Sequence, residues 1–200
     1  MKNIKKYSLI AIILVTGFVM FGCQSEVSQI LYNDQDTTWV ETDNDATVLA
    51  YSLVEQVNEI IIDEEYDTDY EIFLLLKEEL IVSKSALQGI RVEIQAKREA
   101  LNLLKTEFVE NGFKLTAIER GQVGQIIRRL KALRFAAITN LKSLSPIRQE
   151  IEAAHEIQDY ALLNVKLNIV ASTLTLSIYQ ADLALTMLQN LEDIINNHQE

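Results

Sequence analysis

The stretch FLLLKEELIVSKSALQGIRVEIQAKREALNLLKTEF, residues 73–108, decides the fold class. Its apolar side chains recur at alternating intervals of three and four residues, which is the spacing of one face of an α-helix. Nine of the eleven positions on this face are apolar, and Ser83 and Lys97 are the exceptions. We therefore expect a helix over residues 70–110 whose seam is that of a coiled coil or a long bundle helix. The seam consists of Phe73, Leu76, Leu80, Ser83, Leu87, Ile90, Ile94, Lys97, Leu101, Leu104 and Phe108.

Two further helices are expected on either side of this one. Apolar residues at helical spacing predict a helix over residues 45–63. Asn111-Gly112 predicts a left-handed cap at the end of the long helix. Thr116 and Glu119 have the spacing of a capping box, which predicts that a helix begins there and continues to about residue 143.

The last helix is predicted to begin at Ser145-Pro146, with Ser145 as its cap and Pro146 at its first position. It can continue unbroken to about residue 195. The segment 167–181 contains no charged residue, which is typical of a helix in the middle of a bundle. A membrane span is the competing interpretation, and the polar residues inside the segment argue against it.

Glycine and proline are scarce, with six glycines and one proline in 200 residues. Because turns consume these residues, their scarcity indicates long uninterrupted elements. We predict an all-α protein: an elongated antiparallel bundle of three or four long helices with coiled-coil character, spanning residues 45–200. The polar, acidic and aperiodic residues 24–44 are predicted to form a flexible tether.

The N-terminus has the pattern of an export signal. Three lysines lie within the first six residues, and residues 7–21 carry no charge. The stretch ends at Gly22-Cys23, and Cys23 is the only cysteine. Residues 1–23 thus resemble the signal peptide and lipobox of bacterial lipoproteins, although Met20 and Phe21 depart from the residues most common there.

This resemblance implies a signal peptide over residues 1–22, cleaved before a cysteine that carries acyl chains such as palmitate. Residues 23–44 would then comprise the lipidated Cys23 and the tether. The expected location is the cell membrane or the outer membrane, with the bundle facing outside the cytoplasm, in a host with either one or two membranes. An uncleaved apolar anchor with a thiol at Cys23 is the alternative, and it also tethers the chain outside the cytoplasm.

Charge is unevenly distributed along the chain, which has a net charge of −11. Residues 114–148 carry one acidic and eight basic side chains, whereas acidic residues predominate on both sides. Such an acidic protein is not expected to bind nucleic acid. The basic segment has two open interpretations: its side chains pair with acidic neighbouring helices, or they form a docking site for an acidic partner, a phosphate-bearing polymer or lipid headgroups. The candidate docking residues are Arg120, Arg128, Arg129, Lys131, Arg134 and Lys142.

The residues that usually perform catalysis or bind metals are few. Glu152 and His155 have half of the Glu-x-x-His pattern of di-metal bundles, and His198 is the only other histidine. The acidic runs 34–45 and 63–71 are expected to be solvated, with weak binding of divalent cations as the alternative. We expect neither catalysis nor a metal or cofactor.

The expected function is therefore non-enzymatic. The seam predicts that the anchored bundle binds another protein, acts as a scaffold or self-associates through that surface. The alternative is a chaperone-like or ligand-binding bundle. The segments LTAIER, residues 115–120, and LSPIRQ, residues 144–149, resemble the Leu-Thr-x-x-Gln repeats of small periplasmic helical chaperones. That resemblance implies binding of unfolded proteins on a helical cradle.

Overall fold

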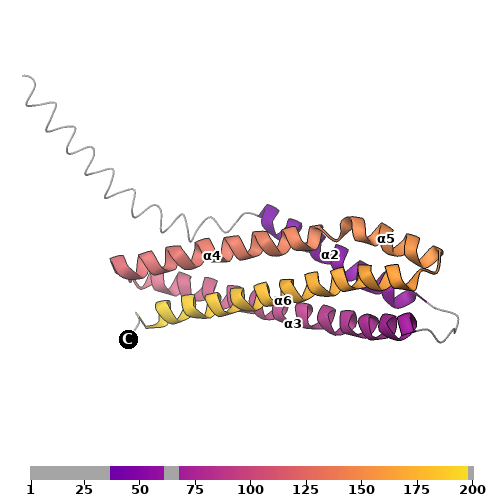
Figure 1. Cartoon of the computed structure of the whole chain (residues 1–200). Coiled ribbons are helices and arrows are strands. Elements are labelled where there is room, and N and C mark those ends of the chain that lie inside the picture. The colour runs from indigo at the N-terminus through magenta and orange to yellow at the C-terminus, as the bar shows by residue number, and fades with distance from the viewer. Residues whose placement is uncertain (1–36, 61–67, 198–200) are drawn as a thin grey trace, which may run out of the picture. The chain divides into compact units, whose positions relative to one another are not determined.

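The structure is a computed structural model, and it describes residues 37–60 and 68–197. Residues 40–200 form a compact unit, and the following description concerns this unit and residues 37–39, with which its first helix begins. All its elements are helices, within the described ranges (Figure 1). They are α2 (Thr37–Glu59), α3 (Thr68–Glu110), α4 (Ala117–Lys142), α5 (Ser145–Glu156) and α6 (Tyr160–Asn196). The prediction of an all-α bundle is confirmed.

The first helix begins earlier than predicted, because α2 starts at Thr37 and not at residue 45. Residues 37–44 of the predicted tether are therefore helical. No glycine or proline lies between Cys23 and Gly89, so no helix-breaking residue type occurs there. The acidic composition that indicated a tether does not prevent a helix from forming.

The junction between α3 and α4 contains both predicted caps. Gly112 adopts a φ of 72°, and the N–H of Phe113 donates to the carbonyl of Phe108 at 3.1 Å. The two phenyl rings also touch, with centroids 5.6 Å apart, which completes a Schellman motif with its apolar contact. At the start of α4, Thr116 N–H donates to the Glu119 carboxylate at 2.6 Å and Glu119 N–H donates to the Thr116 hydroxyl at 3.3 Å.

The predicted last helix is broken into α5 and α6 at residues 157–159. Gln158 adopts a left-handed φ of 55°, and the N–H of Asp159 donates to the carbonyl of Ala154 at 2.9 Å. These are features of a second Schellman motif, with Gln in the position that glycine usually occupies. Asp159 then caps α6, because its carboxylate accepts from the N–H of Leu162 at 2.9 Å. The sequence prediction of an unbroken helix was wrong here because Gln is a poor signal for a helix end.

The start of α5 also differs from the prediction. Leu144 occupies the N-cap position without a side-chain capping bond, so Ser145 is not the cap. Pro146 lies in the first turn, where its missing N–H costs nothing. A tight turn at residues 143–144 therefore joins α4 to α5.

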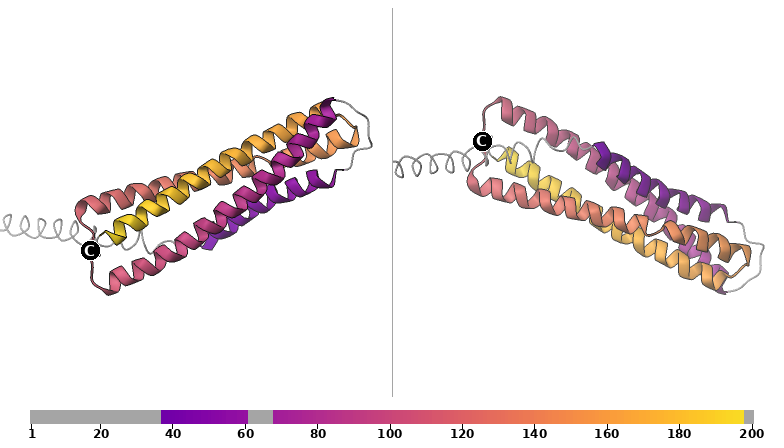
Figure 2. Two further views of the ribbon diagram at one scale, coloured as in Figure 1. Left: turned by 90° about the horizontal axis from the view of Figure 1, so that it is seen from below. Right: turned by 90° about the horizontal axis from the view of Figure 1, so that it is seen from above.

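The two longest helices, α3 and α6, run parallel and are the most closely packed pair (Figure 2). The side-chain amide of Asn164 donates to the carbonyl of Asp69 at 2.8 Å, and Lys97 lies 2.6 Å from Glu192. Because both contacts join residues 95 positions apart, the helices advance in the same direction. This pair results from placing two antiparallel hairpins side by side.

Helices α2 and α3 form an antiparallel hairpin. Lys84 forms an ion pair with Glu55 at 2.7 Å, and Lys77 donates to the carbonyl of Ile60 at 3.2 Å. From one contact to the other, the residue number rises on the α2 side and falls in α3, so the two helices are antiparallel. The same α3 face carries Arg91, whose guanidinium donates to the Thr47 hydroxyl of α2.

Helix α6 lies against three other helices, α3, α4 and α5. Asn140 of α4 donates to Gln180 at 3.3 Å, and Lys166 forms an ion pair with Glu150 of α5 at 2.7 Å. The prediction that the uncharged segment packs in the interior of the bundle is thus confirmed for one face of the helix.

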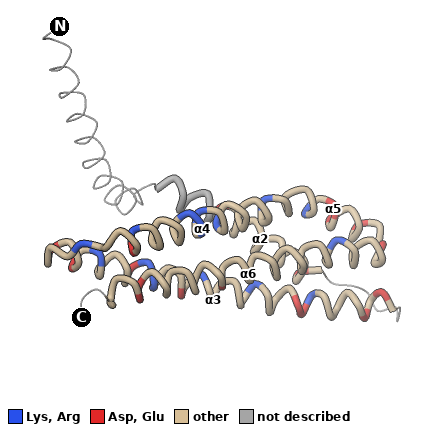
Figure 3. The backbone as a smooth tube through the Cα atoms, turned by 60° about the vertical axis from the view of Figure 1, so that its left-hand side comes forward, with Lys and Arg blue, Asp and Glu red and all other residues tan. Residues whose placement is uncertain are grey.

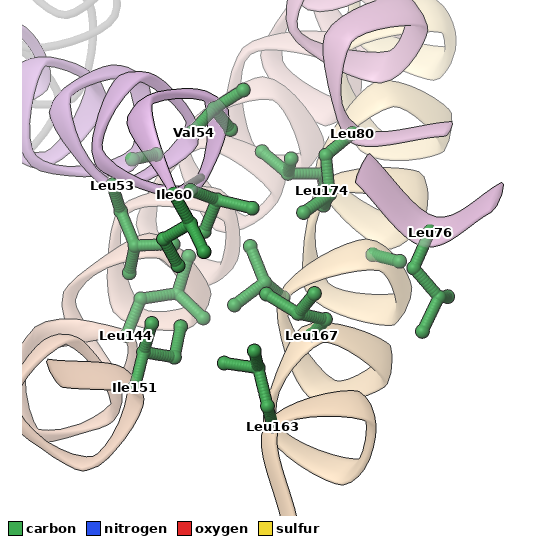
Figure 4. Close-up of a cluster of buried hydrophobic side chains, with 14 of the residues drawn as sticks. Leu53, Val54, Ile60, Leu76, Leu80, Leu144, Ile151, Leu163, Leu167 and Leu174 are labelled. Atoms are coloured by element: carbon green, nitrogen blue, oxygen red, sulfur yellow. The ribbon is translucent and has the colours of Figure 1, made fainter. Parts of the chain in front are cut away.

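The core has two parts. The larger lies where α2, α3, α5 and α6 meet, and Figure 4 shows Leu53, Leu144 and Leu167 among the side chains that point into the space between these helices. Burying one such side chain contributes about 1.5–3 kcal/mol. The fully buried side chains include Leu53, Leu80, Leu144, Ile151, Leu163, Leu167 and Leu174.

The smaller core lies at the opposite end, where α3, α4 and α6 pack without α2. It is built from Leu101, Phe108, Leu115, Val123, Leu188, Leu191 and Ile195. Within the described residues, the bundle therefore has four-helix character at one end and three-helix character at the other.

Candidate functional site

The predicted seam of α3 lies inside the bundle. Seven of its positions are buried, and Ile90, Ile94, Lys97 and Leu104 are half-buried. The seam is thus the contact surface of α3 with its own neighbours. The expected self-association through this surface finds no support, because the folded chain has already covered it.

A different apolar surface is exposed, on α6. Its members recur at the helical spacing of three and four residues, on the side of the helix that the bundle leaves open. Ser172 continues the row and is also exposed. We call this row the α6 stripe: Leu162, Val165, Ile169, Ser172, Leu176 and Tyr179.

The sequence pattern does not identify this stripe, because α6 is apolar on more than one side. Periodicity alone does not distinguish which of two apolar rows faces the core. The absence of charge from residue 167 to residue 181 was the available signal, and it was interpreted as burial on most sides. The buried row has the same spacing as the stripe with a small offset, and it includes Leu163, Leu167, Val170, Leu174 and Ser177.

The intervals between successive residues of the α6 stripe are the same whether they are counted from Leu162 or from Tyr179. About a midpoint between Val170 and Ala171, Leu162 mirrors Tyr179 and Val165 mirrors Leu176. Two antiparallel copies of the stripe would therefore oppose apolar residues along most of their length.

Helix α3 also exposes apolar residues, but its outer face is interrupted by charge. Leu75 and Val82 are exposed on that face, and the exposed carboxylates of Glu78 and Glu79 lie between them. Desolvating carboxylates is costly, so this face is less suited to an apolar contact.

The predicted docking residues all lie on α4, whose Lys and Arg positions are blue in Figure 3. Their environments differ. Arg120 is exposed and donates to the carbonyl of Leu115 at 3.0 Å, and Arg134 is half-buried. The other four, Arg128, Arg129, Lys131 and Lys142, are exposed.

These four exposed residues form no ion pair with any residue in the described ranges. The ion pairs that join helices include Lys84, Lys97 and Lys166, which belong to α3 and α6. The interpretation that the basic segment pairs with its acidic neighbours therefore finds no support at these positions.

A shallow hollow lies beside Arg129, between α4 and α6. Arg129 and Asp193 both line it, together with amide side chains and two isoleucines. Its remaining members are Gln122, Gln125, Ile126, Asn190 and Ile194. The mixed lining and shallow form do not match an enclosed apolar ligand site.

The two glycines of α4 do not mark a close approach to another helix. A Cβ placed on Gly121 or Gly124 would meet no atom within 4 Å. Tight packing against another helix therefore does not explain either glycine.

On α5, Glu152 of the partial Glu-x-x-His pattern contacts other side chains. The carboxylate of Glu152 accepts from the amide of Gln56 at 2.9 Å and lies 3.7 Å from Arg148. Within residues 37–60 and 68–197, no group of three potential metal ligands is found. His198 lies outside the described residues, as do Cys23 with its signal sequence, residues 34–36 of the first acidic run and residues 63–67 of the second.

The hydroxyl of Tyr51, which lies between α2 and α3, has a shifted pKa. Burial raises the pKa of the Tyr51 hydroxyl, and the positive charge of Arg91 opposes this to a smaller extent. Lys84 lies over the Tyr51 ring, 5.6 Å from its centroid. These contacts pack α2 against α3, and we assign them a structural role.

Within the described part of the chain, α6 alone is long and apolar enough to cross a membrane. Its most apolar window is 39% buried in the bundle, so burial accounts for less than half of that window. The feature is thus explained by the two apolar rows of α6.

Comparison of the chain with protein-family models, with curated proteins and with solved structures found no match.

Proposed function

We propose that this protein is a non-enzymatic, membrane-anchored lipoprotein of the bacterial cell envelope whose helical bundle associates with a second copy of the same chain through the α6 stripe. The anchor is supported by the resemblance of residues 1–23 to a lipoprotein signal with Cys23 as the acylated residue. The exposed α6 stripe is the observation that carries the interaction.

The choice of a second copy is based on symmetry and charge. A two-fold axis at the midpoint of the stripe would place Val165 of one copy against Leu176 of the other, and this self-complementarity is what a symmetric dimer requires. The full chain carries a net charge of −11, and loss of the three lysines in residues 1–22 makes each copy more negative still, so two copies repel each other over most of their surface. Segment 167–181 is uncharged and is therefore the part of α6 where this repulsion is weakest.

The anchor is tested by the intact mass and membrane fractionation of the natively expressed chain, beside a Cys23→Ala variant. The expected product begins at Cys23, carries acyl chains and fractionates with membranes. A chain that begins at Met1 without a modification would refute lipidation and leave the uncleaved anchor.

The association is tested in membranes by oxidative cross-linking of the full chain. Ser172→Cys places a thiol close to the proposed two-fold axis, and it should yield a disulfide-linked dimer. Ser85→Cys is the matched control, because Ser85 is an exposed serine on α3. The parent chain controls for any thiol left at Cys23.

A second pair of variants shows whether the apolar contact drives the association. Val165→Asp introduces a charge into the stripe at a side chain that is 55% exposed, and it should abolish the Ser172→Cys dimer. Val92→Asp makes the same change at a 70% exposed valine of α3 and should leave the dimer intact. Equal cross-linking of Ser85→Cys, or a dimer that persists in Val165→Asp, would refute the proposal.

A further inference from the structure

The outermost row of α4 is exposed at every step. Alternating intervals of three and four residues follow one line along the helix, and each position on it is solvent-accessible. At 1.5 Å per residue the row is about 36 Å long. We call it the α4 row: Ile118, Gly121, Gln125, Arg128, Ala132, Phe135, Thr139 and Lys142.

After Glu119, the α4 row and its flanks contain cations without carboxylates. Residues 120–149 include no aspartate or glutamate but seven basic side chains, in a chain whose net charge is −11. The exposed cations on the row, Arg128 and Lys142, and Lys131 beside it have no ion-pair partner in the described ranges. Arg129 differs, since it shares a hollow with Asp193. Positive charge is thus concentrated on one face and left uncompensated there.

Two large apolar side chains lie on the α4 row, Phe135 between Lys131 and Lys142 and Ile118 at the start of the row. Phe135 is 69% exposed, and Ile118 is 76% exposed, the largest fraction of any large apolar side chain in the described residues. Neither side chain belongs to either of the two cores. An exposed phenyl ring between cations is typical of a helix that lies in the interface of a membrane, where the ring enters the acyl boundary and the cations contact phosphates.

We propose that the α4 row binds an anionic lipid surface. The cations Arg128, Lys131 and Lys142 contact headgroup phosphates, and Phe135 enters the boundary between headgroups and acyl chains. An acidic protein surface would match the cations but would give the exposed phenyl ring and Ile118 no apolar environment. The inference rests on the proposed function in one respect: the anchor at residues 1–23 keeps the bundle close to the membrane.

The test uses the full chain reconstituted into vesicles, with tryptophan as a depth probe. Trp39→Phe removes the only native tryptophan, and Phe135→Trp places a new one in the α4 row. Val92→Trp in the same background is the matched control on α3. Vesicles of phosphatidylcholine are compared with vesicles of phosphatidylcholine and phosphatidylglycerol, each containing brominated lipid as quencher.

We expect the fluorescence of the Phe135→Trp variant to be quenched in the anionic vesicles and not in the neutral ones. The Val92→Trp variant should be quenched in neither. High salt should reverse the quenching, because it screens the charges.

A charge-reversal variant tests the role of the cations. One basic side chain contributes about fivefold to binding at an anionic surface, so Arg128→Glu with Lys131→Glu should lower the bound fraction at least about tenfold. Both residues are exposed, so thermal melting should show that the variant remains folded.

Flotation of the same vesicles separates this inference from the proposed function. If the chain floats with both vesicle types and the indole at position 135 is not quenched by anionic vesicles, the anchor stands and the lipid-binding row is refuted. If the chain floats only with anionic vesicles and this indole is quenched, the row is supported and the anchor is refuted. Equal quenching of the Phe135→Trp variant in neutral vesicles, or capture by an acidic protein without any vesicle binding, would overturn the inference.

Discussion

The ammonium of Lys97 on α3 lies 2.6 Å from the carboxylate of Glu192 on α6, and the two side chains are only 24% and 17% exposed. Lys97 is the one charged residue in the α3 seam, and Glu192 explains its presence there. Gln189 also donates to the same carboxylate at 3.1 Å. The pair joins the two parallel helices near the end where α2 is absent.

We expect Lys97→Met and Glu192→Met each to lower the free energy of unfolding by about 1–2 kcal/mol, because each leaves a mostly buried charge without its partner. The double variant should be within about 0.5 kcal/mol of the parent, since it removes both charges. Urea unfolding checks this double-mutant cycle. Arg148→Met is the control, because its pair with Glu152 is half exposed and should contribute less than about 0.5 kcal/mol. Additive losses would show that the pair is not coupled.

Substitution of glycine by alanine should have opposite effects in α4 and at the end of α3. Gly121→Ala and Gly124→Ala should each stabilise the protein by about 1 kcal/mol, because both lie inside a helix with open space at the Cβ position. Gly112→Ala should destabilise it by about 1 kcal/mol, because its φ is 72°. Thermal unfolding of the three variants shows directly whether each substitution raises or lowers the stability. A lower melting temperature for Gly121→Ala would contradict the open space found at its Cβ position.

Loss of the α6 cap should destabilise the helix start. Asp159→Ala removes the carboxylate that accepts from Leu162 N–H, which should cost about 1 kcal/mol. Asp159→Asn retains an acceptor and should lower the free energy of unfolding by only about 0.3 kcal/mol. Gln158→Gly should increase stability, because glycine adopts the left-handed conformation without strain. Chemical denaturation of the three variants provides the comparison.

Stability should depend on Tyr51 at alkaline pH. Because burial raises the pKa of its hydroxyl above the ordinary value of 10.0, the folded state retains a proton that the unfolded state releases. The stability linked to Tyr51 is therefore complete below about pH 10 and is lost as the pH rises further. The free energy of unfolding of the wild type should fall relative to that of Tyr51→Phe above this pH. Parallel pH profiles for the two proteins would show that the pKa is not raised.

Local signals in the sequence predicted several elements correctly. The seam placed the start of α3 to within two residues, and Thr116 with Glu119 placed the start of α4, because capping depends on neighbouring residues only. The α5–α6 break was missed, because a left-handed Gln158 is stabilised by backbone bonds that its residue type does not signal.

The candidate surfaces depend on long-range packing, so they were predicted less well. Periodicity could not decide that the Phe73 row would be buried and the Val165 row exposed, because both are apolar rows of long helices. The basic residues of α4 were identified, but the lack of ion-pair partners at Arg128 and Lys131 within the described ranges depends on the way the two hairpins dock.

Helix α2 is packed less closely than the other helices, and this difference determines how the bundle responds to a pulling force. Within the described residues, α3, α4 and α5 each approach the backbone of α6 closely, whereas α2 is held through side chains such as Leu53 and the Glu55–Lys84 pair. Tension applied to the chain before α2 therefore reaches its most weakly held helix first. Detachment of α2 would uncover the four-helix core and leave the three-helix end intact, so a pulling experiment should record two successive rupture events, with the smaller force first.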